Sequence, residues 1–348
     1  MQHKPVRDAL QAHFDIDARK LEFISRFIIA LLKVRSVNLT QLATALNGFA
    51  KLESNARRVK RFLNVDFAQE MIARFVLSFI TTEKVVLTMD RTNWQFGAVH
   101  INFLVIGIAH NGIALPIAWV NLEKAGNSNA SERKTILERV LKVIPANRIQ
   151  GFAADREFIG AAWFKTLLEN AVNPVIRIKK DTVLQQRTKS APAWVWFNSH
   201  KQGEIKELGK ARVMGIRVFV IGTLTEDGEY LLLVTIKRPS RALSIYAQRW
   251  NIETLFAALK TRGFNLEETR MVHKDRSERL FALLVIALVW AVRVGEFVSS
   301  LTRIALKKNG SPPRSVFRVG LDTLRQILLS GCAGQLVLDD VIPLLSSS

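Results

Sequence analysis

The stretch from Tyr246 to Lys260 reads YAQRWNIETLFAALK. Its phenol, guanidinium, carboxylate and ammonium groups are spaced by three, four and seven residues. At about 100° per residue, these groups fall within roughly 60° of one another on one helix face. A carboxylate set among phosphate-binding donors suits metal-dependent phosphoryl transfer, because the carboxylate holds the ion while the cations hold the substrate. The alternative is a solvated helix face with salt bridges. The four residues are Tyr246, Arg249, Glu253 and Lys260.

The chain of 348 residues is strongly basic, with 50 Lys and Arg against 30 Asp and Glu and a formal net charge of +20. An excess of this size indicates a polyanionic partner, with nucleic acid as the leading candidate. Basic residues are concentrated between Asn173 and Arg217 and in a short segment with Arg57, Arg58, Lys60 and Arg61. Such patches are typical of phosphate contacts, although some serve only as solubilising surface.

The single cysteine, Cys332, excludes a disulfide framework within the chain and a zinc site of several cysteines. A reducing, cytoplasmic compartment fits this composition. The N-terminal residues lack the apolar core and cleavage site of a signal peptide. The longest apolar run, Phe281 to Val292, is shorter than the roughly 20 residues that span a bilayer, so we interpret it as a buried helix and expect no membrane partner.

Residues 1–80 have the apolar spacing of helices. A helix over Asn38–Asn47 has a capping residue at its start, and a second, basic helix is expected over Ser54–Phe62. With a turn at Gly48, the pair predicts a small helical DNA-binding unit, of which a helix-turn-helix is one version. A helical cap that packs on the main domain without touching DNA remains the alternative.

Residues 81–180 alternate between strands and helices, which predicts an α/β core. Two acids each follow a short apolar strand, Asp90 after Val85–Met89 and Asp155 after Ile149–Ala154. Two aspartates at the ends of adjacent strands, with a glutamate on a later helix, form the acid triad of a ribonuclease-H-like fold. Hard oxygen ligands suit Mg²⁺ or Mn²⁺, and two ions about 4 Å apart can promote in-line displacement at phosphorus. Either aspartate alone is more typical of a turn or a helix cap.

Residues 181–236 predict a β-rich insertion into that core, with a turn at Glu226–Gly228. Aromatic side chains in a basic sheet can stack on unpaired bases, but they serve equally as core packing. The aromatic residues in question are Trp194, Trp196 and Tyr230, and the expected strands cover residues 193–197, 203–208, 212–223 and 229–235.

The order of these parts resembles the DDE transposases of the bacterial insertion-sequence family four. Asp90 and Asp155 are followed by a β insertion and then by the pattern Tyr-x2-Arg-x3-Glu-x6-Lys. The resemblance extends from about Leu87 to Lys260, and the last pattern is its most specific element.

The resemblance implies cut-and-paste transposition with a divalent metal. Relatives bind terminal inverted repeats of double-stranded DNA, pair two ends in a dimeric synaptic complex, nick the element end, form and reopen a hairpin, and join the end to target DNA. It also implies a bacterial cytoplasmic protein that associates with the nucleoid when bound to DNA. No Gly-rich phosphate loop occurs in the sequence, so no nucleotide cofactor is expected.

The site residues follow by position. Asp90, Asp155 and Glu253 would be the catalytic metal ligands for two Mg²⁺ or Mn²⁺ ions. Tyr246, Arg249 and Lys260 would hold phosphates near the scissile bond, and Trp250 would pack beside the DNA end. Tyr230 stands where relatives carry the aromatic that stacks on a flipped base. The remaining expected DNA contacts are Arg156, Arg57, Arg58 and Arg61.

We therefore expect a ribonuclease-H-like α/β core over residues 81–180 and 237–305, interrupted by the insertion over 181–236. A helical DNA-binding unit (1–80) precedes it, and a helical tail (306–348), a possible dimer contact, follows. Two rival functions remain: a metal-dependent nuclease that does not join DNA, and a transposase-derived repressor with a vestigial site.

Overall fold

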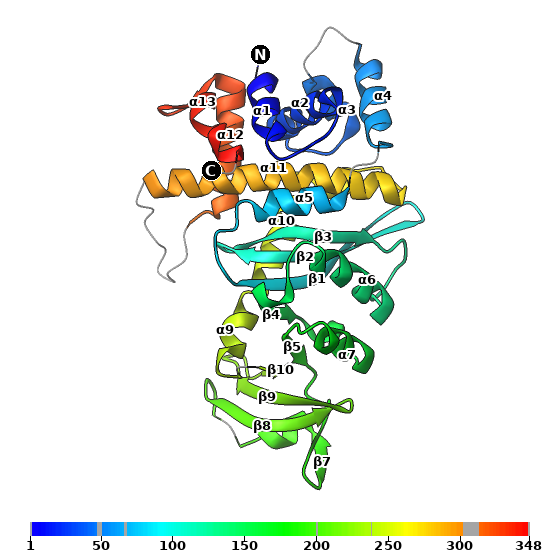
Figure 1. The fold of residues 1–348 in the computed structure, drawn as a ribbon, viewed down its shortest axis with the longest axis vertical. Coiled ribbons are helices and arrows are strands. Elements are labelled where there is room, and N and C mark those ends of the chain that lie inside the picture. Colours follow the sequence, from blue (N-terminus) through cyan, green and yellow to red (C-terminus); the bar gives the residue numbers. More distant parts are fainter. Residues whose placement is uncertain are drawn as a thin grey trace.

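The structure is a computed structural model and describes residues 2–46, 51–65, 68–199, 201–237, 239–301 and 313–346. Helices from both ends of the chain gather above a long sheet, and helix α11 (Lys274–Leu301) lies between the two (Figure 1). The N-terminal helices are α1 (His3–Gln11), α2 (Ala18–Val34), α3 (Leu39–Ala45), α4 (Leu52–Phe62) and α5 (Gln69–Leu77).

The sheet has ten strands in the order β3-β2-β1-β4-β5-β10-β9-β8-β6-β7. Strand β1 is antiparallel to β2 but parallel to β4, and β4 is parallel to β5. This mixed sheet, with helices packed around it, confirms the α/β class. The strands are β1 (Val85–Phe96), β2 (Val99–His110), β3 (Ile113–Asn121), β4 (Ile149–Ala154), β5 (Pro174–Ile178), β6 (Val183–Gln186), β7 (Lys189–Pro192), β8 (Ile205–Val213), β9 (Ile216–Leu224) and β10 (Tyr230–Thr235).

Alternate residues of the central strands face opposite sides of the sheet. On one side, Val86, Ala153 and Val175 form a buried cluster with Ile245 of helix α9 (Ala242–Ala247), and we call this side the α9 face. On the other side, α6 (Ala130–Leu141) and α7 (Ala161–Glu169) cover the sheet, and the ring of Trp163 lies edge-on to that of Phe152. Both faces are therefore buried, which explains the apolar runs of β1 and β4.

The N-terminal helices are capped by side chains at two places. Asp17 accepts hydrogen bonds from backbone amides at the start of α2, and Asn38 does the same for α3, as the sequence predicts. The buried amide of Asn55 donates to the carbonyl oxygens of Ala43 and Leu46, which fixes α4 against α3. The predicted turn at Gly48 lies outside the described residues.

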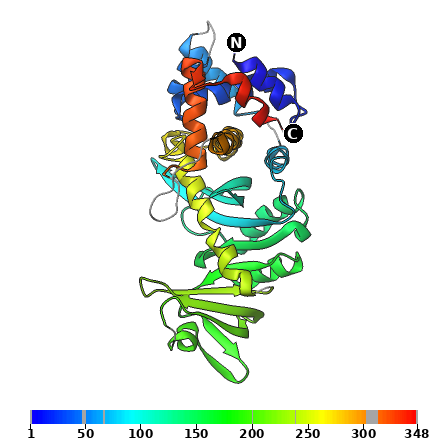
Figure 2. The same ribbon diagram turned by 90° about the vertical axis from the view of Figure 1, so that its left-hand side faces the viewer.

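Helix α11 is the central helix of the molecule. Figure 2 views it end-on, with α5, α12 (Val316–Ser330) and the sheet around it. It has the length and composition of a membrane-spanning helix, with a mean hydropathy of 2.1 over its most apolar window, but 78% of that window is buried inside the protein. The apolar run Phe281–Val292 lies inside this 28-residue helix, and its interpretation as a buried helix is confirmed.

Two glycines allow α11 and α12 to cross at backbone contact. A Cβ atom on Gly320 would lie 1.7 Å from the carbonyl oxygen of Ala291, and one on Gly295 would lie 1.9 Å from that of Val316. The C-terminal helix therefore packs on the core. The chain then forms a short hairpin of β11 (Cys332–Ala333) and β12 (Leu336–Val337) and helix α13 (Leu338–Val341).

The insertion differs from the sequence prediction in three places. Residues 193–197 form the short helix α8 (Ala193–Phe197) instead of a strand. The hairpin of β6 and β7 was not predicted, and the expected strand over 212–223 is two strands joined by a turn at Met214–Gly215. Short apolar runs do not distinguish a strand from a buried helical turn, which explains the error at α8.

Candidate active site

Strands β1 and β4 bring Asp90 and Asp155 together. Their parallel register pairs Thr88 with Ala153 and Met89 with Ala154, so the two acids occupy neighbouring positions at the end of the ladder. Asp90 lies two residues after Thr88 and Asp155 two after Ala153, which places both on the α9 face. Asp90 is not at a strand end as expected, because β1 continues to Phe96 along its antiparallel partner β2.

The predicted single helix over Tyr246–Lys260 is wrong. Helix α9 ends at Ala247, and after a turn at Gln248–Arg249 the chain continues as α10 (Trp250–Leu259). Before the interruption, α9 lies tightly on the sheet, where a Cβ on Gly151 would approach Ile245 Cγ2 to 2.8 Å. Tyr246 and Arg249 nevertheless contact the two aspartates, and Glu253 contacts Arg249.

Three side chains of the Tyr246–Lys260 stretch contact one another or the two aspartates. The Tyr246 hydroxyl donates to Asp155 Oδ1 at 3.3 Å. Arg249 forms an ion pair with Glu253 at 2.8 Å and lies 3.9 Å from Asp90 Oδ2. Arg249 is only 8% exposed, and its Nε has no hydrogen-bond partner among the described residues. This guanidinium is therefore held between two carboxylates with one donor unused.

Lys260 lies apart from this group. It follows the last residue of α10, and its ammonium group pairs with Glu267 at 2.7 Å and donates to the carbonyl oxygen of Asn93 at 3.3 Å. Asn93 is three residues beyond Asp90 on β1. Lys260 thus borders the site along β1 instead of joining its centre.

The site disfavours ionisation of two groups. Burial, with repulsion from Glu157 and Asp155, raises the pKa of Asp90 to about 6, although the Arg91 amide and Arg249 oppose this effect. Burial and the nearby Asp155 raise the pKa of Tyr246 to about 12, so the phenol stays protonated as a hydrogen-bond donor. Accumulated negative charge is what a bound cation would relieve.

The donor chemistry at this place fits a hard divalent cation, since Asp90 and Asp155 offer carboxylate oxygens side by side. Among the described residues, no three or more Asp, Glu, His or Cys side chains already form a metal-binding group. Glu253 is engaged by Arg249 instead. Asp90 and Asp155 are therefore the candidate ligands of an ion at this place, and Glu253 is a third candidate that pairs with Arg249.

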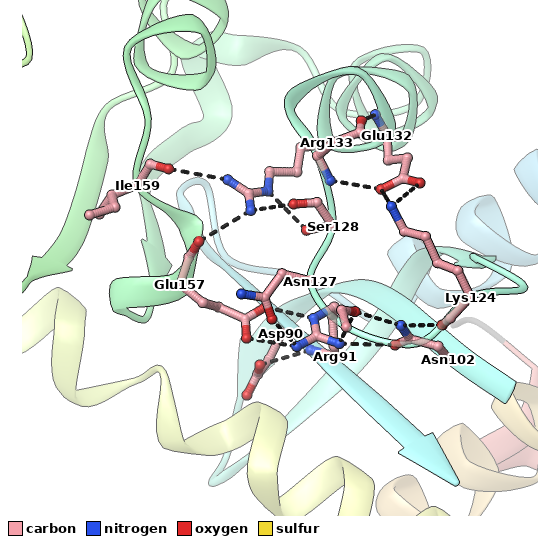
Figure 3. A network of polar contacts seen from close by, with 12 residues as sticks. Asp90, Arg91, Asn102, Lys124, Asn127, Ser128, Glu132, Arg133, Glu157 and Ile159 are labelled. Carbon is pink, nitrogen blue, oxygen red and sulfur yellow. Dashed lines mark hydrogen bonds and ion pairs between the residues drawn. The ribbon is translucent and has the colours of Figure 1, made fainter. Parts of the chain in front are cut away.

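A polar network beside Asp90 was missed at the sequence level (Figure 3). Arg91 forms a two-pronged ion pair with Glu157, with Nε–Oε1 at 2.7 Å and Nη2–Oε2 at 2.9 Å. It also donates to the side chains of Asn102 and Asn127. The network fixes the segment after Asp155 against β1. The available signal was the charged residue that follows each aspartate, in Asp90-Arg91 and in Asp155-Arg156-Glu157.

Buried Arg133 of α6 extends the network. It donates to the hydroxyl and carbonyl oxygens of Ser128 and to the carbonyl oxygens of Glu157 and Ile159, and its guanidinium lies over the Phe158 ring. The loop after Asp155 is thus held from both sides (Figure 3). We expect such support to keep the Asp155 carboxylate in place.

The remaining predicted contacts lie at different distances from the site. Trp250 is 61% exposed with the Arg249 guanidinium 5.0 Å from its ring, and Arg156 is exposed directly after Asp155. Tyr230 starts β10 but packs on the side of the sheet opposite the α9 face, whereas Leu231 and Leu233 pack toward α9. The structure therefore does not bring Tyr230 to the acids. The predicted contacts Arg57, Arg58 and Arg61 are exposed on α4, above α11.

Comparison with known proteins gives a family match. The family model described as "Transposase DDE domain" matches residues 83–290, more than half of the chain and the part that holds all three acids. A search of curated proteins gave no match. Among solved structures, the cryo-EM structure of a piggyBac transposase synaptic complex with hairpin DNA is similar with a TM-score of 0.47 at 12% sequence identity, covering 96% of this chain and 77% of that chain.

Proposed function

This chain belongs to the transposase DDE domain family, and we propose that it excises an insertion sequence by metal-dependent cleavage and hairpin formation and joins it to target DNA. The observation that carries the proposal is the convergence of Asp90, Asp155 and the Arg249–Glu253 pair on one face of the sheet. The pattern Tyr-x2-Arg-x3-Glu-x6-Lys supports membership of the insertion-sequence family four.

The strand order also supports a ribonuclease-H-like core. Three antiparallel strands (β3, β2, β1) are followed by two parallel ones (β4, β5), with the two aspartates on the central pair. We propose the division predicted above, with the core over 81–180 and 237–305, the insertion over 181–236, the DNA-binding unit over 1–80 and the tail over 306–348. A homodimer in the cytoplasm is part of the same proposal.

In the proposed reaction, a water or a 3′-hydroxyl oxygen attacks phosphorus in line with the leaving oxygen. Two bound Mg²⁺ or Mn²⁺ ions would activate the attacking oxygen and stabilise the leaving one. Asp90 and Asp155 would hold the ions, with Tyr246 orienting Asp155 through its hydrogen bond. Arg249 would exchange Glu253 for the scissile phosphate, which frees that carboxylate as the third ligand and gives the unused Nε a partner.

The test is cleavage and joining of a labelled duplex that carries the element's terminal repeat, with Mg²⁺ or Mn²⁺. Wild-type protein should yield nicked, hairpin and joined products, and Glu253→Gln should yield none while still binding the duplex. Glu138→Gln, at an exposed position on α6, is the matched control and should behave as wild type. Cleavage without joining would establish the nuclease alternative, and binding without cleavage by wild-type protein the repressor alternative.

A further inference from the structure

A cleft of about 460 Å³ separates the N-terminal helices α3 and α4 from the segment that joins α10 to α11. Figure 1 shows α4 above the N-terminal end of α11. The cleft does not include the acids of the candidate active site. Its lining residues are Asn38, Leu39, Thr40, Ala56, Lys60, Leu63, Glu268, Arg270, Met271, Val272, His273 and Arg276.

Cations line this cleft from two sides. Lys60 contributes from α4, Arg270 from the opposite segment, and Arg276 from the first turn of α11. Arg276 is held in place by a hydrogen bond from its Nε to Asn64 Oδ1 at 2.7 Å. Among the described lining residues, Glu268 is the one acid, and the Ser36 hydroxyl donates to its carboxylate. The cleft therefore carries an excess of positive charge.

Two further features extend this charge. The exposed side chains of Arg57, Arg58 and Arg61 lie on α4 outside the cleft and continue its basic surface. The 28-residue helix α11 begins beside His273, so the positive end of its dipole adds to the side chains. Asp275, in the first turn of α11, lines a different cavity with Gln69 and Arg139.

We propose that this cleft binds the phosphate backbone of double-stranded DNA, an inference that rests on the proposed function. A duplex presents a row of phosphates, which matches cations spread over two elements and an adjoining helix better than a single small anion does. The 268–276 segment follows α10 in the chain, and α10 is the helix that carries Glu253.

Contacts of the connecting segment link the cleft to the candidate active site. Glu267 pairs with Lys260 beside β1. The next residue, Glu268, accepts a hydrogen bond from the hydroxyl of Ser36, which lies just before α3. The Val37 amide donates to the carbonyl oxygen of Phe264 at 3.1 Å. The wall of the cleft and the end of α10 are thus one hydrogen-bonded unit, which keeps the bound duplex in a defined position relative to the acids.

The experiment measures the affinity for a labelled duplex of about 30 base pairs by fluorescence anisotropy. It is done without divalent metal and over a range of salt concentrations. Lys60→Ala and Arg270→Ala should each weaken binding about 3- to 10-fold and lower the slope of log K against log salt by about 0.9, and the double variant should show both effects combined. Arg270→Lys keeps the charge and should retain most of the affinity. Lys165→Ala, at an exposed position on α7, is the control and should bind as wild type.

A double variant with wild-type affinity and salt slope overturns the inference, as does wild-type protein that fails to bind the duplex. Melting temperatures of all variants confirm that they are folded. Metal-dependent cleavage is measured separately on the same duplex with the terminal repeat. If the wild-type protein cleaves the duplex but the double variant binds as tightly as wild type, only the DNA-binding role of the cleft is refuted. If the double variant binds more weakly but the wild-type protein does not cleave, only the proposed transposase activity is refuted.

Discussion

Asp90 lies among groups that disfavour its charge. Its pKa of about 6 in the folded protein exceeds the ordinary value of 3.8, so the folded state binds the proton more tightly than the unfolded state. Stability that is present below pH 3.8 is therefore lost as the pH rises through 6. At pH 7 without metal, the ionised carboxylate costs up to about 3 kcal/mol.

Asp90→Asn should consequently raise the melting temperature at pH 7 to 8 in the presence of a chelator, while abolishing cleavage. The gain should shrink toward pH 4, where Asp90 is protonated, and Mg²⁺ should stabilise the wild-type protein more than the variant. Calorimetry across this pH range checks the prediction. A variant less stable than wild type at pH 7 would contradict it.

Arg91 acts on the site through Glu157. Arg91→Ala leaves the Glu157 carboxylate uncompensated near Asp90, which should raise the pKa of Asp90 further. We expect cleavage at pH 7 to fall about tenfold or more and the acidic limb of the pH–rate profile to move to higher pH. Arg91→Lys keeps the positive charge beside Glu157 and should therefore shift the acidic limb less than Arg91→Ala does. A variant that loses activity equally at every pH would indicate only a structural role.

At the scale of the secondary-structure elements, the approach of α9 to the sheet depends on Gly151. Gly151→Ala would bring a methyl group to 2.8 Å from Ile245 Cγ2, so α9 must move outward and carry Tyr246 away from Asp155. We expect a loss of about 1–3 kcal/mol in the free energy of unfolding together with a loss of cleavage activity.

Adding Ile245→Ala to Gly151→Ala provides the internal control. The shorter side chain makes room for the new methyl group, so the double variant should recover more cleavage activity than stability. Chemical denaturation and the nicking assay measure the two quantities. If the double variant is no more active than Gly151→Ala, the position of α9 is not what limits activity.

Several elements could be predicted from sequence because their signals are local. The strands that carry the acids are apolar runs, and the cap at Asn38 and the hairpin turn at Glu226–Gly228 use residues suited to those backbone conformations. The break between α9 and α10 has no such signal, since Gln248 and Arg249 are good helix formers. The contacts around the break are long-range: Ile245 packs over Gly151, which lies far earlier in the chain, and Arg249 contacts Asp90.

The site shows the same division. The three acids and Arg249 could be proposed from the sequence because their types and spacing match a chemical task, and they remain candidate site residues. Lys260 was misplaced because the helical periodicity assumed for it ends at Leu259. Arg133 and Asn102 were missed because their roles come from long-range contacts with loops, and a single sequence does not show those contacts.

At the scale of the whole molecule, α11 connects the parts. Trp119 of β3 donates to the carbonyl oxygen of Glu278, and the Trp290 indole donates to that of Val341 near the C-terminus. At the far end of the helix, Glu296 pairs with His110 at the tip of β2. One helix therefore contacts the sheet and the C-terminal segment, and it also packs on α2 and α5.

The crossing of α11 with α12 gives a prediction at this scale. Gly320→Ala would place a methyl group inside the backbone of α11, so the helices must separate. We expect a loss of about 3 kcal/mol or more in the free energy of unfolding and early proteolytic release of the C-terminal segment. Gly334→Ala, in the C-terminal hairpin where no atom lies within 4 Å of the new methyl group, tests the specificity of the effect, since its cost should come only from the strained backbone. Equal stability of Gly320→Ala and wild type would contradict the close crossing.

The order of the acids along the chain matters for biosynthesis. Strands β1 and β4 supply Asp90 and Asp155, but Glu253 follows all the strands of the ten-stranded sheet. A ribosome therefore completes the whole sheet before the last acid is made, and the segment that faces the N-terminal helices across the cleft is made later still. Truncated translation products that end just before residue 253 therefore contain every strand of this sheet but lack Glu253.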